Sequence, residues 1–135
     1  MALTYDISPS GDRVRIVGAG ALTTSDFVAI IQRIHSDPRR LPDSTALVDL
    51  RDASYQPKDD AEIIHIAKAL EAFRAVVNNN IAIVANKCTV FLAELFSLHV
   101  RAETHVEVRV FTDIRAAEAF CTGRWSPQTA CMIPA

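Results

Sequence analysis

The feature that most constrains this fold is a run of strand-forming residues, Thr45 to Leu50, that breaks abruptly into the charged pair Arg51-Asp52. The run does not alternate strictly between apolar and polar residues, which is typical of a strand covered on both faces in a parallel sheet. Ile81 to Ala85 repeats the pattern, a short apolar run bounded by polar residues. The sequence therefore predicts two interior strands, at residues 45–50 and 81–85.

Other segments alternate between apolar and polar residues, which indicates strands with one solvent-exposed face. Leu3 to Ile7 has a period of two, a turn follows at Pro9 to Asp12, and the alternation resumes at Val14 and Ile16, so we expect a β-hairpin. Val106 to Phe111 also alternates and is the expected last strand. Gly18-Ala19-Gly20 is interpreted as a spacer, because the third glycine of a dinucleotide fingerprint is missing.

Segments whose apolar residues have helical spacing separate these strands. Thr24 or Ser25 is expected to cap a first helix, and Asp113 to cap the last one. A long helix follows Asp60, and another begins near Thr89. The expected inward residues of these helices are Phe27, Ile30, Ile31 and Ile34 in the first, Ile63, Ile66, Ala67, Leu70, Phe73 and Val77 in the second, Phe91 or Leu92 with Leu95, Leu98 and Ala102 in the third, and Ile114, Ala117, Phe120 and Cys121 in the last.

These elements give the order ββαβαβαβα and an α/β fold with a mixed five-stranded sheet. The hairpin is expected at one edge of that sheet and residues 106–111 beyond the interior strands. We expect one domain over residues 1–123, with residues 124–135 as a C-terminal tail. At 135 residues the chain is long enough to bury one core without disulfides or metals.

Composition narrows the function classes. Half of the residues are apolar and 22% are charged, which is the balance of a folded chain. The formal net charge of -2 predicts no general attraction to nucleic acid or anionic lipid. The sequence has no signal-peptide pattern and no apolar run long enough to span a bilayer, so we expect a cytoplasmic protein. Cys88, Cys121 and Cys131 are expected to be reduced, buried thiols.

Catalytic and metal-binding patterns are weak. No serine lies in a G-x-S-x-G turn, and no metal or cofactor is expected. Glu62 and His65 have the i, i+3 spacing of carboxylate-bridged metal sites, but a second such pair is missing, and they are interpreted as an exposed helix face. An enzyme acting through Asp49 and Asp52 is the least favoured alternative. We therefore expect a non-enzymatic protein.

Polar residues follow the interior and last strands. Because ligands and partners meet parallel sheets at the carboxyl ends of the strands, these residues form a candidate rim for a partner or ligand. Its members are Arg51, Asp52, Asn86, Lys87, Thr112 and Asp113.

The completed pattern resembles the STAS domain family, the anti-sigma-factor antagonists, and more closely the bacterial STAS/SEC14-like domains whose role is largely undefined. Three segments carry the resemblance: residues 20–23 before the first helix, residues 47–50 in the third strand, and residues 108–113 before the last helix. The family's antagonists have a phosphorylated serine after the third strand. Here that stretch reads Pro57-Lys58-Asp59-Asp60, so this switch is not expected.

The resemblance implies a cytoplasmic protein-interaction or regulatory module with a protein partner. The SEC14 relation implies an alternative, a carrier of a small apolar ligand or lipid. A homodimer is also predicted, because the edge hairpin carries Arg13 and Arg15 beside Asp6, a mixed-charge surface that can pair with itself about a two-fold axis.

Overall fold

The computed structural model of this chain describes residues 3–41, 44–72, 80–103 and 107–122. The order ββαβαβαβα predicted from the sequence is confirmed. The elements are β1 (Leu3–Ile7), β2 (Arg13–Leu22), α1 (Thr24–His35), β3 (Thr45–Tyr55), α2 (Asp60–Ala72), β4 (Ile81–Val84), α3 (Val90–Glu103), β5 (Val108–Phe111) and α4 (Ile114–Cys121). The predicted tail, residues 124–135, and the helix positions Phe73 and Val77 lie outside the described residues.

The five strands form one mixed sheet in the order β1-β2-β3-β4-β5. β1 and β2 pair antiparallel as a hairpin, whereas the β2–β3, β3–β4 and β4–β5 pairs are parallel. The strands predicted to be interior, β3 and β4, are interior, and the hairpin occupies one edge. The contrast between continuous and alternating apolar patterns therefore predicted the sheet correctly.

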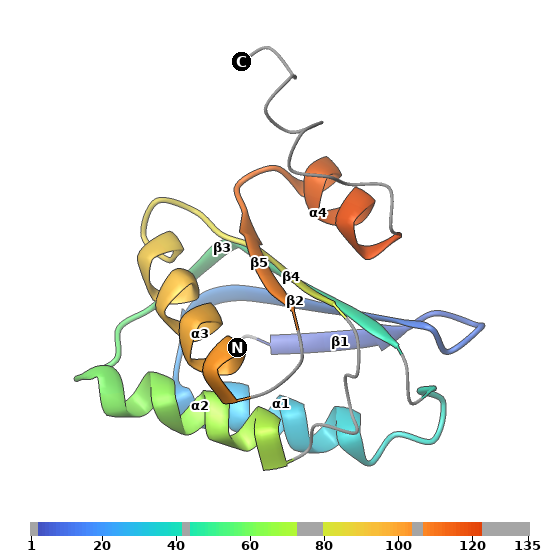
Figure 1. The fold of residues 1–135 in the computed structure, drawn as a ribbon, viewed down its shortest axis with the longest axis horizontal. Coiled ribbons are helices and arrows are strands. Elements are labelled where there is room, and N and C mark those ends of the chain that lie inside the picture. The colour runs from blue at the N-terminus through green and yellow to red at the C-terminus, as the bar shows by residue number, and fades with distance from the viewer. Residues whose placement is uncertain (1–2, 42–43, 73–79, 104–106, 123–135) are drawn as a thin grey trace.

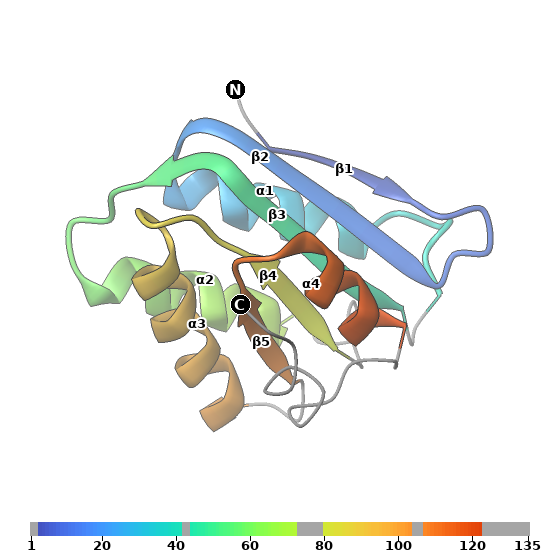
Figure 2. The same cartoon turned by 90° about the horizontal axis from the view of Figure 1, so that it is seen from above.

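The helices cover the two faces of the sheet unequally. α1, α2 and α3 lie on one face, and α4 is the only helix of the described residues on the other (Figure 1). Side chains from β3 and β4 alternate between two cores. Leu50 and Ile83 pack in the large core under α1–α3, whereas Leu47 and Val84 pack with Phe120 under α4. Seen from the α4 side, β1 and β2 are left uncovered by α4 (Figure 2).

β2 and β3 are both longer than the sequence predicts. Gly18–Gly20 is not a spacer but part of β2, and β3 continues past Arg51-Asp52 to Tyr55. The additional residues of β2 and β3 pair with each other. This pairing continues to Leu22 and Tyr55, whereas the last β3–β4 pair is at Asp49. The register of this pairing shifts between Val17 and Ala19, as at a β-bulge, and the pairing resumes at Ala19 and Asp52.

Helix α1 begins one residue earlier than expected. Its N-cap is Thr23, whose hydroxyl accepts from the backbone N–H of Asp26, while the Asp26 carboxylate accepts from the backbone N–H of Thr23. This reciprocal capping box satisfies two N–H groups at the helix start. The cap predicted for α4 is confirmed, since Asp113 accepts from the backbone N–H of Arg115.

The inward face of α3 differs from the prediction. Phe91 is 68% exposed and Leu98 is 60% exposed, whereas Ala93 and Val100 are buried. The alternative, Leu92, does face inward and lines a cavity. α3 carries apolar residues on both sides, so helical spacing alone could not identify the buried face.

Asn86 ties the β4–α3 turn to β3. Its side-chain amide nitrogen lies 2.9 Å from the carbonyl oxygens of Arg51 and Ala53 and 3.3 Å from that of Leu50. Its side-chain oxygen accepts from the backbone N–H groups of Cys88 and Thr89 at the start of α3. One side chain therefore satisfies β3 carbonyls beyond the end of β4 and caps a helix.

Asn86→Asp should lower the free energy of unfolding by about 1–3 kcal/mol, because the carboxylate keeps the helix cap but cannot donate to the β3 carbonyls. Urea denaturation measures the change. The exposed neighbour substitution Lys87→Ala is the control and should change stability by less than about 0.5 kcal/mol. Equal stability of Asn86→Asp and the unmodified protein would show that the β3 carbonyls do not need the amide.

Candidate functional site: an apolar cavity beneath the sheet

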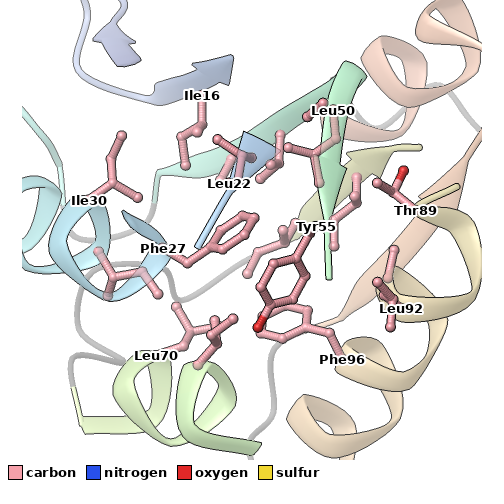
Figure 3. Close-up of a pocket in the computed structure, with 18 of the residues that line it drawn as sticks. Ile16, Leu22, Phe27, Ile30, Leu50, Tyr55, Leu70, Thr89, Leu92 and Phe96 are labelled. Carbon is pink, nitrogen blue, oxygen red and sulfur yellow. The ribbon is translucent and has the colours of Figure 1, made fainter. Parts of the chain in front are cut away.

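A cavity of about 120 Å³ lies between the sheet and helices α1, α2 and α3. Figure 3 shows side chains from these elements pointing into one space. Almost every lining residue is apolar. The lining residues are Val14, Ile16, Leu22, Phe27, Ile30, Ile31, Ile34, Ala46, Val48, Leu50, Ala53, Tyr55, Ile63, Ile66, Leu70, Ile81, Ile83, Thr89, Leu92, Ala93 and Phe96.

Small side chains in the middle of the fold leave this space. Ala46 and Ala53 on β3 and Ala93 on α3 all line the cavity. Val48 is paired with Ile16 on one side and Ile83 on the other, a position where full burial is expected. It is nevertheless only partly buried, because the space above it is not filled by another side chain.

The lining contains two side-chain hydroxyl groups, those of Tyr55 and Thr89. The Thr89 hydroxyl is engaged with Asn86: it accepts from the backbone N–H of that residue at 3.0 Å and lies 3.2 Å from its side-chain oxygen. The Tyr55 hydroxyl bonds to Thr24. The wall is therefore suited to an apolar molecule and poorly suited to one that needs hydrogen bonds inside it.

Aromatic side chains line one part of the cavity. The rings of Phe27 on α1 and Tyr55 on β3 meet edge to face, with centroids 5.2 Å apart and planes at 68°. Figure 3 shows Tyr55 between Phe27 and Phe96. Tyr55 is the last residue of β3 and is partly exposed, unlike the buried Ala53 two residues before it. The Tyr55 ring therefore lies where the cavity wall meets the surface.

The hydroxyl of Tyr55 belongs to a chain of hydrogen bonds across three elements. It lies 2.7 Å from the hydroxyl of Thr24 at the start of α1. The Thr24 hydroxyl donates to Oε1 of Glu62 in the first turn of α2, also at 2.7 Å. The other Glu62 oxygen accepts from the backbone N–H of Lys58. This chain fixes the end of β3 against the beginnings of α1 and α2.

The two ends of this chain have pKa values shifted in opposite directions. Burial raises the pKa of Tyr55 above its usual value, which keeps the phenol protonated. The pKa of Glu62 is lowered, first by the backbone N–H of Lys58 and then by the Thr24 hydroxyl. Tyr55 is thus neutral and Glu62 is charged at neutral pH.

The predicted rim residues lie around the carboxyl ends of β4 and β5, beside the middle of β3. The backbone N–H of Ala85 donates to the carbonyl of Phe111, which brings the ends of β4 and β5 together. Some rim side chains have structural partners: Asn86 holds β3, Asp113 caps α4, and Arg51 bonds to Asp49 at 2.8 Å. The remaining rim residues are exposed: Asp52, Lys87 and Thr112. Binding of a ligand or partner at this rim stays a prediction.

The two aspartates of the enzyme alternative are not equivalent. The Asp49 carboxylate is buried and bonded to the guanidinium of Arg51, which lowers the pKa of Asp49 below its usual value. Asp52 is exposed. Since Asp49 stays ionised and occupied by Arg51, it is a poor proton donor at neutral pH.

The cysteines also differ. Cys88 is exposed, so the expectation of a buried thiol is wrong for it. Cys121 is partly buried, and burial raises its pKa to about 11, which keeps the thiol neutral. Cys131 lies outside the described residues. Within the described ranges, no three His, Cys, Asp or Glu residues are grouped so as to hold a metal ion, and no helix has the length and apolarity to cross a membrane.

Sequence reasoning missed Tyr55, Thr24 and Glu62 as a connected site. Tyr55 lies beyond the strand predicted at residues 45–50, and the sequence pattern connects Glu62 only with His65. The alanines in the strand and helix patterns, Ala53 and Ala93, were the available signal, because small residues at inward positions leave space.

Comparison with known proteins identifies the fold. No protein-family model matches the chain, and no curated protein matches it. Among solved structures, it is similar to an uncharacterised protein of the DUF3478 family with a SpoIIAA-like fold from Shewanella loihica PV-4. The two share 16% identity with a TM-score of 0.58, over 89% of this chain and 92% of that one. This chain therefore has a SpoIIAA-like fold, as its resemblance to the STAS family predicts.

Proposed function

We propose that this chain is a non-enzymatic binding module that holds one small apolar molecule in the cavity between the sheet and α1–α3. The cavity itself carries the proposal: it is preformed, and its lining is apolar except for two hydroxyl groups that already have partners. Pockets with such walls bind by excluding water from apolar surfaces. This choice favours the apolar-ligand alternative from the sequence.

The volume limits the ligand. An engineered protein cavity of about 150 Å³ lined by leucine, isoleucine and phenylalanine binds benzene. The cavity here, at about 120 Å³, is of similar size. It fits one aromatic ring or a short hydrocarbon segment, and it is too small for a whole phospholipid. A longer ligand would have to leave its remaining part outside the cavity.

Benzene should bind with saturable amide chemical-shift changes in β3 and α3, measured by two-dimensional NMR, and Val48→Phe should abolish them by filling the space over β3. Ala93→Leu, which fills the cavity from α3, should act in the same way. The matched control is Val17→Phe, since Val17 is exposed on the opposite face of the sheet and should leave binding unchanged.

Phenol provides a second control. It has nearly the shape of benzene, but its hydroxyl would be buried against apolar walls at a cost of about 1–3 kcal/mol. Phenol should therefore bind roughly 5- to 150-fold more weakly. Shifts that survive Val48→Phe, or phenol binding as tightly as benzene, would contradict an apolar ligand in this cavity.

We also propose protein interaction, the leading hypothesis from the sequence, as a second function, with another copy of this chain as the partner. The observation that favours it is the sheet face beside α4, where β1 and β2 are left uncovered by α4 (Figure 2). Arg13, Arg15 and Val17 of β2 are exposed there. Acidic groups lie in the same patch: Asp6 is opposite Arg15 in the hairpin, and Glu118 of α4 lies 3.9 Å from Arg15. Such a surface can pair with itself about a two-fold axis.

Reversing Arg13 and Arg15 to Glu should turn a homodimer into a folded monomer, because charges at the rim of an interface direct pairing without supporting the core. Sedimentation equilibrium gives the mass, and circular dichroism verifies the fold. The matched control, Lys58→Glu with Lys68→Glu, makes the same charge change at exposed positions elsewhere and should leave a dimer. An unmodified protein that is monomeric at high micromolar concentration would rule this partner out.

A further inference from the structure

Tyr55 separates the apolar cavity from the surface. Its ring lines the cavity, and its hydroxyl bonds to Thr24 in the first turn of α1, whose hydroxyl donates to Glu62 in the first turn of α2. Figure 3 shows the ring between Phe27 and Phe96. A displacement of this one side chain would therefore remove part of the cavity wall at the end of β3.

The direction of the hydrogen bonds at Tyr55 follows from the donors and acceptors. An ionised carboxylate can only accept, so the single hydroxyl hydrogen of Thr24 is given to Glu62. The Tyr55 hydroxyl must then donate to the Thr24 oxygen. Bonds that end on a charged acceptor are stronger than bonds between neutral groups. Glu62 thus anchors the chain that holds the Tyr55 ring in place.

We propose that Tyr55 is the gate of the apolar cavity and that Thr24 and Glu62 hold the gate closed. The proposal rests on the proposed apolar-ligand function and assigns the route of the ligand. When the bond between Tyr55 and Thr24 breaks, the ring turns away from Phe27, and an apolar molecule passes between the first turns of α1 and α2. The gate then closes over the ligand.

A gate controls rates and leaves the affinity nearly unchanged. The closed state lines the cavity with the Tyr55 ring whether or not the hydroxyl is bonded, so contacts with the bound molecule persist without it. Losing the hydrogen bond makes the open state more populated. Association and dissociation then accelerate by the same factor, and their ratio stays constant.

The test is the exchange rate of benzene, measured by NMR line shapes and magnetisation exchange on the full chain. Tyr55→Phe keeps the ring and removes the hydroxyl, and it should raise both rate constants by roughly two- to tenfold, the effect of one hydrogen bond. The dissociation constant should stay within about twofold. Thr24→Val, which removes the acceptor with little change of shape, should reproduce the effect if Tyr55→Phe perturbs the fold.

The chain offers a matched control in Tyr5. Its hydroxyl donates to Oδ2 of Asp37 at 2.8 Å, so Tyr5→Phe also removes a bond from a tyrosine toward a carboxylate. Tyr5 is not among the residues that line the cavity. Tyr5→Phe should therefore leave the rates of benzene exchange unchanged, whatever it does to stability.

The outcomes separate the gate from the function beneath it. Benzene that binds the unmodified protein and exchanges at the same rates in Tyr55→Phe would overturn the gate and leave the ligand function standing. Benzene that binds neither protein would overturn both. Binding seen only after Tyr55→Phe would support a gate closed too firmly for this probe. If Tyr5→Phe accelerated benzene exchange as much as Tyr55→Phe does, the effect would be a general loosening of the fold, and the gate would be overturned.

Discussion

The pairing of β3 with β2 over its whole length, and with β4 over only part of it, is the constraint on which the rest of the structure depends. β3 pairs with β4 from Ala46 to Asp49 but continues beside β2 to Tyr55. Beyond the end of β4, the side-chain amide of Asn86 donates to the β3 carbonyls of Arg51 and Ala53. This extension carries the Tyr55 ring to the first turns of α1 and α2, so the end of the sheet becomes a wall of the cavity.

The cavity is costly if it stays empty. With about 24 cal/mol per Å³ of unfilled volume, a space of about 120 Å³ destabilises the fold by about 3 kcal/mol. That is a large fraction of the 5–15 kcal/mol that typically separates folded from unfolded states. Ala53 and Ala93 line this space, and a larger apolar residue at either position would fill part of it. A bound apolar molecule would offset this cost.

The sequence predicted the fold better than the site because the two depend on different features. The sheet follows from patterns over many residues. The continuous apolar run from Ile81 to Ala85 indicates an interior strand, and the alternation from Leu3 to Ile7 indicates a strand with one solvent-exposed face. α3 shows where such reasoning stops. Phe91, Leu95 and Leu98 form one apolar stripe and Ala93, Phe96 and Val100 another, and only the packing against the sheet makes the second the inner one.

The site depends on unfilled volume and on contacts between distant segments. Neither feature produces a periodic pattern in the sequence. Tyr55 and Thr24 are separated by 31 residues, and Thr24 and Glu62 by 38. Their hydrogen bonds require the β3 extension, which the charged pair Arg51-Asp52 concealed. Both residues are exposed within β3, beside the register shift in the β2–β3 pairing, and exposed charged side chains do not have to end a strand.

The alternation along β3 also keeps the two candidate functions physically separate. Val48 faces the cavity, whereas the next residue, Asp49, faces the opposite side, where it bonds to Arg51 and feels the charge of Arg15. The sheet backbone lies between the apolar site and the charged surface, so they share no side-chain contact along this strand. Substitutions with no shared partners act nearly independently. A change in charge on β2 therefore tests association without refilling the cavity, and a larger side chain over β3 tests the cavity without altering the charged face.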